Sequence, residues 1–207
     1  MTRIEVKEAL STSVANGLVN LKGWVRTKRG SKNVSFIALN DGSTLSNIQI
    51  VAEQNISDDI LKLINTGSSI SVIGKLVQSK GSGQAIELLA ESIDLIGVAD
   101  PDEYPLQPKK HSLEFLREKA HLRFRTNTFG AVFRIRHAMT FAIHNFFDSK
   151  GFSNIHTPII TGSDCEGAGE MFAVSTLDKV NTPLTKDGDV DYSKDFFGKE
   201  TNLTVSG

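Results

Sequence analysis

The residues best suited to binding chemistry lie in a basic segment near the N-terminus, KGWVRTKRGSK at 22–32. It holds five basic side chains and no acidic one. Lysine and arginine contact nucleic acid phosphates without reading the bases, so such a segment is suited to positioning a polynucleotide. The side chains that we expect to form this solvated basic rim are Lys22, Arg26, Lys28 and Lys32. Trp24 shares their face by alternation, although a bulky tryptophan in a small β domain is more often structural.

The charge of the whole chain is nearly balanced but unevenly distributed. Its 207 residues include 23 basic and 24 acidic side chains, for a net charge of −1, which argues against a generic polyanion binder. Nine acidic and four basic residues follow Ser163, so the C-terminal part is acidic. A local field still governs contact at one surface. The composition therefore allows a nucleic acid partner at the basic segment alone.

Composition also constrains the setting of the protein. A single cysteine, Cys165, excludes an internal disulfide framework and predicts a reducing, cytoplasmic location. No apolar run approaches the length that crosses a bilayer, and charges occupy the N-terminus where a signal peptide needs an apolar stretch. We therefore expect no membrane partner. The five histidines match no compact zinc spacing and Cys165 has no identifiable base, so we assign no metal site and no catalytic residue.

The first hundred residues show the alternation that is typical of β-strands. The predicted strands cover 19–26, 33–39, 45–51, 69–77 and 84–96, with a basic, glycine-containing connection after the first strand. Asn40–Ser43 supplies turn chemistry between the second and third strands. A short helix, capped by Asn55 or Ser57 and buried through Ile60, Leu61 and Ile64, follows the third strand. Three strands, a helix and two strands is the order of the OB-fold, a five-stranded barrel that often binds oligonucleotides.

The second half predicts helices and extended chain. Three of the five prolines lie within residues 101–108, which marks a domain boundary. Ser112 opens a short helix through about His121, and a longer helix starts near Thr128, capped by Thr126 or Asn127, and ends at Gly151. The segment 152–161 is extended and contains Pro158, and an acidic, loop-like stretch follows. We predict a domain at 1–100, a linker at 101–125 and a second domain at 126–207.

Four stretches carry a resemblance to a known family. RFRTNT at 123–128, FRIRH at 133–137 and GFSNIHTPIIT at 151–161 resemble motif 1 of the class II aminoacyl-tRNA synthetases. CEGAGEMF at 165–172 is similar to the stretch that separates the asparaginyl members from their aspartyl relatives. The resemblance implies an α+β chain, with an N-terminal five-stranded OB-fold β-barrel followed by the start of a class II synthetase antiparallel α/β catalytic domain.

The resemblance also implies site residues. It places Arg29, Phe36 and Gln49 at positions that bind the tRNA anticodon, where aromatic rings stack on bases and Arg or Gln bonds base edges or phosphates. By pattern alone, Phe36 in FIAL is more typical of a core residue. The resemblance places Glu166, and more weakly Ser163, against the α-ammonium of the substrate asparagine, and Pro158 at a homodimer interface. A solvated loop glutamate is the alternative for Glu166.

The activity implied is ATP-dependent attachment of asparagine to its tRNA through an aminoacyl-adenylate. Its partners would be tRNA, asparagine and ATP, with Mg²⁺ in the full-length enzyme. Motifs 2 and 3, which carry the arginines that bind ATP in this family, are not among these 207 residues. We therefore expect an N-terminal portion of such an enzyme, inactive by itself and without bound cofactor. The alternatives are a non-catalytic OB-fold module for single-stranded RNA and an aspartyl-tRNA synthetase.

Overall fold

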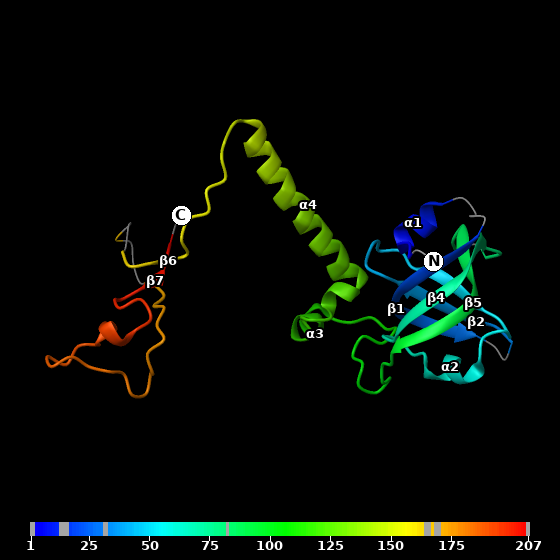
Figure 1. The fold of residues 1–207 in the computed structure, drawn as a ribbon, viewed down its shortest axis with the longest axis horizontal. Helices are drawn as coiled ribbons and strands as arrows, with labels where there is room; N and C mark the ends of the chain where they lie inside the picture. The colour runs from blue at the N-terminus through cyan, green and yellow to red at the C-terminus, as the bar shows by residue number, and fades with distance from the viewer. Residues whose placement is uncertain are drawn as a thin grey trace. The chain divides into compact units, whose positions relative to one another are not determined.

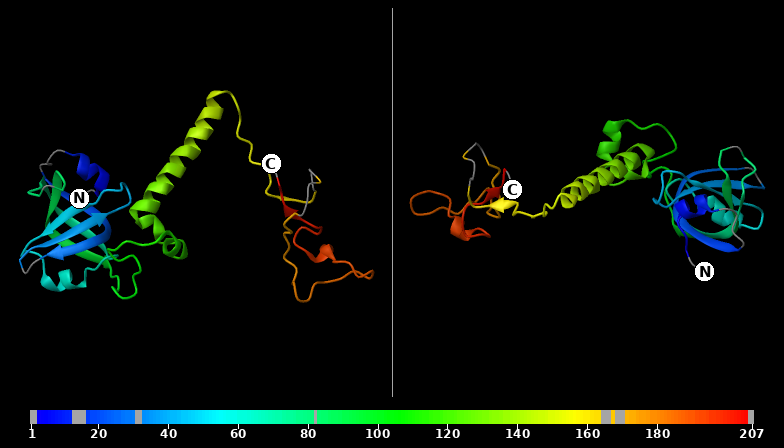
Figure 2. Two further views of the ribbon diagram at one scale, coloured as in Figure 1. Left: turned by 180° about the vertical axis from the view of Figure 1, so that it is seen from behind. Right: turned by 90° about the horizontal axis from the view of Figure 1, so that it is seen from above.

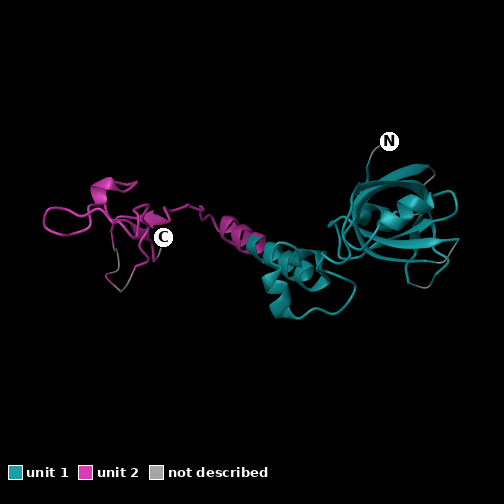
Figure 3. Ribbon diagram, turned by 90° about the horizontal axis from the view of Figure 1, so that it is seen from below, with its two compact units in different colours: residues 1–140 teal, residues 141–207 magenta. Residues whose placement is uncertain are grey.

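The computed structural model describes residues 3–12, 17–30, 33–81, 83–163, 167 and 171–205. By contacts between residues the chain divides into two compact units, 1–140 and 141–207 (Figure 3). The first unit contains the β-barrel, its two short helices and the beginning of a long helix. The second contains the rest of that helix and an irregular segment with one small sheet. Each unit is described by itself.

Five strands of the first unit form a closed barrel (Figure 1). The strands are β1 (Leu18–Gly30), β2 (Ser35–Asn40), β3 (Ile48–Ala52), β4 (Ser69–Gln78) and β5 (Ile86–Gly97). Their order around the barrel is β1-β2-β3-β5-β4, with every neighbouring pair antiparallel except β3 and β5, which run parallel. The predicted five-stranded OB-fold barrel is therefore confirmed.

The barrel interior is filled by aliphatic side chains from every strand. Leu21, Ile37, Ile50, Val72 and Leu88 have no exposed surface, and each comes from a different strand. Because successive strand residues point to opposite faces, their immediate neighbours in sequence point outward. This alternation places the outward side chains of β1, β2 and β3 on one continuous surface.

The first strand differs from its prediction in a way that matters for the site. Residues 27–30, expected to be a connection, continue β1 and pair with β2. The register between β1 and β2 shifts between Val25 and Thr27, which is a β-bulge at Arg26. A bulge inserts one residue and so reverses which face the following side chains occupy. Lys28 consequently lies opposite the buried Ile37, and Arg29 lies opposite Phe36.

Two short helices, α1 (Val6–Ser11) and α2 (Asp58–Leu63), lie at opposite ends of the barrel (Figures 1 and 2). α1 has no side-chain cap of its own. Instead Asp41, in the turn after β2, accepts a hydrogen bond from the backbone amide of Val6 at 2.9 Å. Gly42 in this turn has φ +86° and donates to the Asn40 side chain, as the turn chemistry of Asn40–Ser43 predicted.

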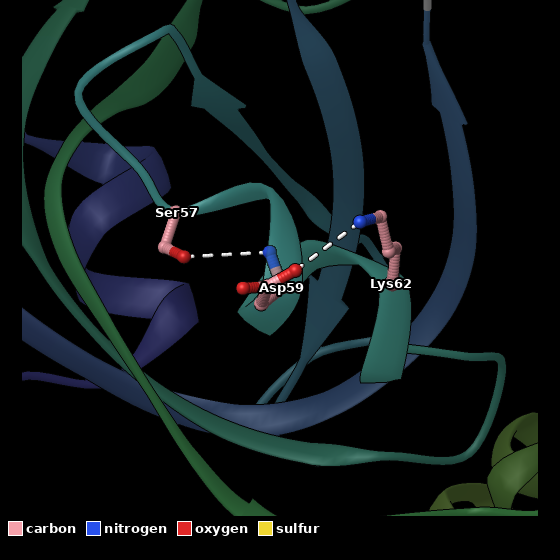
Figure 4. Close-up of polar contacts among 3 residues, drawn as sticks. All are labelled: Ser57, Asp59 and Lys62. Carbon is pink, nitrogen blue, oxygen red and sulfur yellow. Dashed lines mark hydrogen bonds and ion pairs between the residues drawn. The ribbon is translucent and has the colours of Figure 1, made fainter.

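The N-terminus of α2 decides between the two predicted caps. The Ser57 hydroxyl accepts a hydrogen bond from the Asp59 amide, and Asp59 pairs with Lys62 at 3.1 Å (Figure 4). Ser57 is the cap, and Asn55 instead donates to the carbonyl of Ala90 on β5. Of the three predicted apolar residues, Ile64 is fully buried, whereas Ile60 and Leu61 are only partly buried against the core.

Two helices follow the proline-rich segment, as predicted. α3 covers Leu113–Glu118 with the Ser112 hydroxyl accepting from the Phe115 amide. A 3₁₀ turn, η1 (Arg123–Arg125), precedes α4 (Asn127–Ser149). The Thr126 hydroxyl accepts from the Phe129 amide, so Thr126 rather than Asn127 caps α4.

The C-terminus of α4 is closed by a Schellman motif. Gly151, at φ +83°, donates to the Asp148 carbonyl, and Phe152 donates to the Phe147 carbonyl. The Phe147 and Phe152 rings meet edge to face at 5.5 Å, the apolar contact that accompanies this motif. Gly151 therefore ends the helix as predicted, because only glycine adopts this backbone conformation readily.

The segment after α4 is extended, as predicted, but little of it is paired. Its strand β6 (Ile160–Thr161) pairs with β7 (Asn202–Leu203), and a 3₁₀ turn η2 (Tyr192–Lys194) lies between them in sequence. The buried Asp195 carboxylate accepts hydrogen bonds from Ser175, Thr176 and the Phe196 amide, which ties these loops together. None of the helices in the described part of the chain has the length and apolar character needed to cross a membrane.

Candidate nucleic-acid interface

Three of the predicted site residues meet on the outer surface of β1, β2 and β3, called here the β1–β3 face and defined by Arg29, Phe36 and Gln49. Arg29 lies opposite Phe36, and its guanidinium carbon is 5.9 Å from the centre of the Phe36 ring. The guanidinium also lies 3.4 Å from the Gln49 amide oxygen. Phe36 is only partly buried, so the core alternative for this residue is wrong. A partly open aromatic face beside an arginine is suited to stacking an unpaired base.

The Gln49 amide is held from both ends. Its nitrogen donates to the Glu87 carboxylate at 3.1 Å, while its oxygen faces Arg29. Glu87 lies next to Gln49 because β3 and β5 pair in parallel, and its other donor is the Ser79 hydroxyl at 3.0 Å. A hydrogen bond to an ionised carboxylate is stronger than one between neutral groups. The network therefore fixes which end of the amide faces which neighbour.

Glu87 is the residue of this surface that sequence reasoning missed. It is only 8% exposed although it is charged, and it lies between the buried Ile86 and Leu88. A carboxylate inside an apolar strand is the one signal that the sequence offers for it. Its partner Gln49 lies 38 residues away, so the pairing itself could not be read from the local sequence.

An open groove runs along this face. The described residues that line it include Arg29, Leu45, Asn47, Gln49, Ser79 and Asn127. Its lining includes guanidinium, amide and hydroxyl groups, which can donate hydrogen bonds and, for the amides and hydroxyls, also accept them. The groove therefore has the chemistry to contact base edges beside a stacking platform.

The predicted basic rim is only partly formed. Lys22 is exposed on β1 as expected. Lys28, turned inward by the bulge, donates to the Leu61 carbonyl in the last turn of α2 at 2.6 Å, and burial lowers its pKa. Arg26 lies 3.4 Å from the Asn127 amide oxygen, and Lys32 lies outside the described residues. Lys28 is still exposed, as a solvated rim requires, although the bulge directs it to the end of the barrel.

Trp24 is 39% exposed on the outer face of β1 and forms a stacked pair with Arg125, whose guanidinium carbon is 4.6 Å from the ring centre. The contact joins the barrel to η1, within the first unit. This supports the structural interpretation of the tryptophan. Trp24 also lines a second cavity.

The other predicted site residues belong to the second unit. Glu166 and Cys165 lie outside the described residues. Ser163 is exposed just after β6, and its backbone amide donates to the Thr161 hydroxyl at 3.2 Å. Pro158 is exposed in the extended segment before β6. Among the described residues, no group of three or more His, Cys, Asp or Glu side chains could hold a metal ion.

Comparison with known proteins matches each half of the chain to a family. Residues 19–96 match the family described as OB-fold nucleic acid binding domain, which corresponds to the barrel. Residues 112–186 match the family of class II tRNA synthetases (D, K and N), which begins at α3. The two matches fall on either side of the proline-rich segment.

Relatives and solved structures agree with these matches. The asparagine–tRNA ligase of Cytophaga hutchinsonii is 61% identical over 210 residues, covering 100% of this chain and 45% of the relative. That of Porphyromonas gingivalis is 57% identical over 208 residues, covering 100% and 44%. The asparaginyl-tRNA synthetase of Pyrococcus horikoshii, complexed with asparaginyl-adenylate, aligns with a TM-score of 0.78 at 20% identity, covering 100% and 43%. The aspartyl-tRNA synthetase of Entamoeba histolytica aligns at 0.62 and 20% identity, covering 76% and 39%.

The barrel with its polar groove is therefore similar to the OB-fold nucleic acid binding domains, and the segment that follows it is similar to the class II tRNA synthetases (D, K and N). Over its whole length the sequence is similar to asparagine–tRNA ligases, with 61% and 57% identity to the two relatives above. The chain spans about 45% of the length of those relatives. The structural likeness at 20% identity shows the fold, and it extends to both asparaginyl and aspartyl synthetases.

Proposed function

We propose that this chain is the anticodon-binding domain and the first part of the catalytic domain of an asparagine–tRNA ligase. The complete protein would attach asparagine to its tRNA at the expense of ATP. We divide the chain at the boundaries that the sequence predicts: an anticodon-binding domain at 1–100, a linker at 101–125 and part of the catalytic domain at 126–207. The match at 19–96 supports the first of these domains, whereas the match at 112–186 begins within the predicted linker.

The observation that carries the proposal is the convergence of Arg29, Phe36 and Gln49 on one open surface of the barrel. A single-stranded base stacked on Phe36 would place its edge within reach of the Gln49 amide and the Arg29 guanidinium. Stacking supplies affinity for any base, and directed hydrogen bonds supply discrimination. The Glu87 carboxylate holds the amide in one orientation, so the hydrogen-bond pattern that a base meets is fixed in advance.

The reaction of the complete protein would proceed in two steps. The asparagine carboxylate attacks the α-phosphate of ATP, forming asparaginyl-adenylate and releasing pyrophosphate. The ribose hydroxyl at the tRNA 3′ end then attacks the acyl carbon and releases AMP. The protein contributes mainly positioning and charge stabilisation. The described residues offer no cluster for Mg²⁺, so no residue here is assigned to the ion.

We propose Glu166, with Ser163 as a weaker candidate, for contact with the α-ammonium of asparagine. A carboxylate there would form a charge-assisted hydrogen bond, which is the stronger kind. We also propose a cytoplasmic homodimer with Pro158 at its interface. On α4, apolar side chains such as Ile135, Met139 and Phe146 are 56–63% exposed, which supports an apolar interface along this helix.

The test is performed on the complete protein that contains this chain. Asparagine-dependent exchange of pyrophosphate into ATP measures adenylate formation without tRNA, and aspartate in place of asparagine tests the aspartyl alternative. We expect exchange with asparagine only. Exchange with aspartate would favour the aspartyl synthetase, and no exchange with either, together with RNA binding, would favour the non-catalytic module. The 207-residue chain alone should show no exchange, since it lacks the ATP-gripping arginines.

A further inference from the structure

A second cavity, called here the basic cavity, lies within the first unit beside the β1–β3 face. Its volume is about 430 Å³. The barrel contributes Trp24 and Arg26 of β1 and the turn after β2, and the other wall comes from the proline-rich segment, η1 and the first turns of α4. The cavity therefore lies where the two family matches meet along the chain.

The charges around this cavity have one sign. Its described lining includes the cationic side chains Arg26, Lys109, Lys110, Arg125 and Arg134, together with His111. None of the described lining residues is acidic, although the chain has 24 acidic residues against 23 basic ones. None of these cations takes part in an ion pair with another described residue. Arg26 and Arg134 donate to neutral oxygen atoms of Asn127, Gly130 and Gly42.

The arginines are preorganised for an anion. The Arg134 guanidinium is anchored by the carbonyls of Gly42 and Gly130, and the Arg125 guanidinium carbon lies over the Trp24 ring at 4.6 Å. The Nε atom of Arg125 is buried, and no described residue accepts a hydrogen bond from it. Burial lowers the pKa of Arg26, and the charge of Arg125 lowers it further while Tyr104 acts in the opposite direction. Desolvated cations that repel one another are stabilised when an anion enters between them.

The basic cavity continues into the groove of the β1–β3 face. Leu45, Asn47 and Asn127 line both of them. A strand whose bases lie against Phe36 and Gln49 has its backbone within reach of this shared wall. Each nucleotide of such a strand carries one negative charge. The cations that line the basic cavity would meet these charges beyond the shared wall. A single extended ligand with regularly spaced anions fits both sites.

We propose that the basic cavity binds backbone phosphates of the same RNA strand whose bases the β1–β3 face reads. The inference rests on the proposed function and extends it to a sequence-independent contact on the linker side of the barrel. Phosphate contacts position a nucleic acid, and base contacts specify it. The cavity therefore contributes affinity and register, and the β1–β3 face contributes discrimination.

The test measures binding of the 207-residue chain to two RNA stem-loops at several salt concentrations. One carries the anticodon GUU, complementary to an asparagine codon, and the other has these three bases replaced. The main variant is K109Q/K110Q, which removes two charges from exposed side chains and leaves the barrel packing intact. R125Q is the second variant. The matched control is K179Q/K186Q, which removes two exposed charges from the second unit.

We expect K109Q/K110Q to bind both stem-loops roughly tenfold more weakly, with unchanged discrimination between them. The slope of log affinity against log salt should fall by about 1.5, since each lost phosphate contact removes about 0.7–0.9. R125Q should weaken both stem-loops in the same way, and the control should bind like the wild type. Wild-type affinity and slope in K109Q/K110Q, or an equal loss in the control, would overturn the proposal.

The anticodon function and the phosphate site are tested by different arms of the experiment. If the wild-type chain does not prefer the GUU stem-loop, the anticodon function proposed for the barrel fails. If the wild type does prefer it but K109Q/K110Q behaves identically, only the phosphate site fails. A loss of discrimination in K109Q/K110Q would also overturn the proposal, because it would assign these lysines to base reading.

Discussion

Arg29 and Phe36 lie directly opposite each other on neighbouring strands, with the guanidinium carbon 5.9 Å from the centre of the ring. This relationship exists because the bulge at Arg26 carries Arg29 to the outer face of the barrel. The arginine and the ring together form a platform with a charged edge. Gln49, on the neighbouring strand β3, adds an amide to this platform beside Arg29. Removing the ring and removing the support of the amide should therefore affect RNA binding differently.

Replacing Phe36 with alanine should weaken binding of the GUU stem-loop by about 1–3 kcal/mol, because the stacking surface for a base disappears. The measurement is equilibrium binding at fixed salt. Phe172→Ala, which removes a 79% exposed ring from the second unit, is the matched control and should bind normally. Wild-type affinity in Phe36→Ala would contradict the stacking role.

Replacing Glu87 with alanine should reduce discrimination between the cognate and base-replaced stem-loops by roughly tenfold. The Gln49 amide loses the carboxylate that orients it, and hydrogen bonds to charged groups contribute about 1.5–3 kcal/mol. Affinity for the base-replaced stem-loop should change little. Glu91→Ala, on the same strand and paired with Lys75, is the control. Unchanged discrimination in Glu87→Ala would show that Gln49 does not depend on this hydrogen bond.

Replacing Asp41 with alanine should lower the free energy of unfolding of the barrel by about 1–2 kcal/mol. Burial alone raises the pKa of this carboxyl, but hydrogen bonds from Ser43 and Val6 outweigh it and leave the pKa lowered. The variant loses the cap of α1 and the closure of the turn after β2. Urea unfolding followed by fluorescence of Trp24, the single tryptophan, measures the change. Glu53→Ala, at an exposed position, should unfold like the wild type.

The loops around Asp195 should lose protection in acid. Hydrogen bonds from the Ser175 hydroxyl and then from Thr176 hold the pKa of this carboxyl well below its usual range. Because the folded pKa is depressed, the carboxylate stabilises the loops above the unfolded pKa of about 4, and this stability is lost as the pH falls below it. Hydrogen exchange of the Thr176 and Phe196 amides measures the effect.

The control for this titration lies in the same part of the chain. The Gly188 amide donates to the Thr185 carbonyl and makes no contact with the carboxylate, so its protection should not follow the same curve. In Asp195→Asn, protection of the Thr176 amide should be low throughout and independent of pH. Wild-type protection that persists unchanged in acid would argue against the depressed pKa.

In the complete protein, Glu166→Gln should raise the KM for asparagine by roughly tenfold to a hundredfold, with a smaller effect on the KM for ATP. The variant loses the charge that would pair with the α-ammonium of the substrate, a contribution of about 1.5–3 kcal/mol. Steady-state pyrophosphate exchange provides both constants. Glu200→Gln removes an exposed carboxylate and serves as the control. Normal kinetics with asparagine would leave Glu166 as loop surface.

Local sequence was sufficient for the order of the barrel strands, α2 and the two following helices, but helix α1 was not predicted. The strand alternation and the stop at Gly151 each depend on a few neighbouring residues, whereas the choice of Ser57 over Asn55 as the cap of α2 came from the structure. The family motifs, which are also contiguous in sequence, indicated the class of protein and named Arg29, Phe36 and Gln49. Contiguous patterns are what a sequence displays directly.

Only the tertiary structure decided which side chains share a surface. Alternation from Leu21 and Val25 would direct Arg29 inward and Lys28 outward, and the bulge at Arg26 reverses both. Strand register depends on pairing with a partner strand, which local alternation does not determine. The partnership of Gln49 with Glu87 and the cationic wall of the basic cavity likewise join residues distant in sequence. Their positions follow from the closure of the barrel and from the packing of the linker against it.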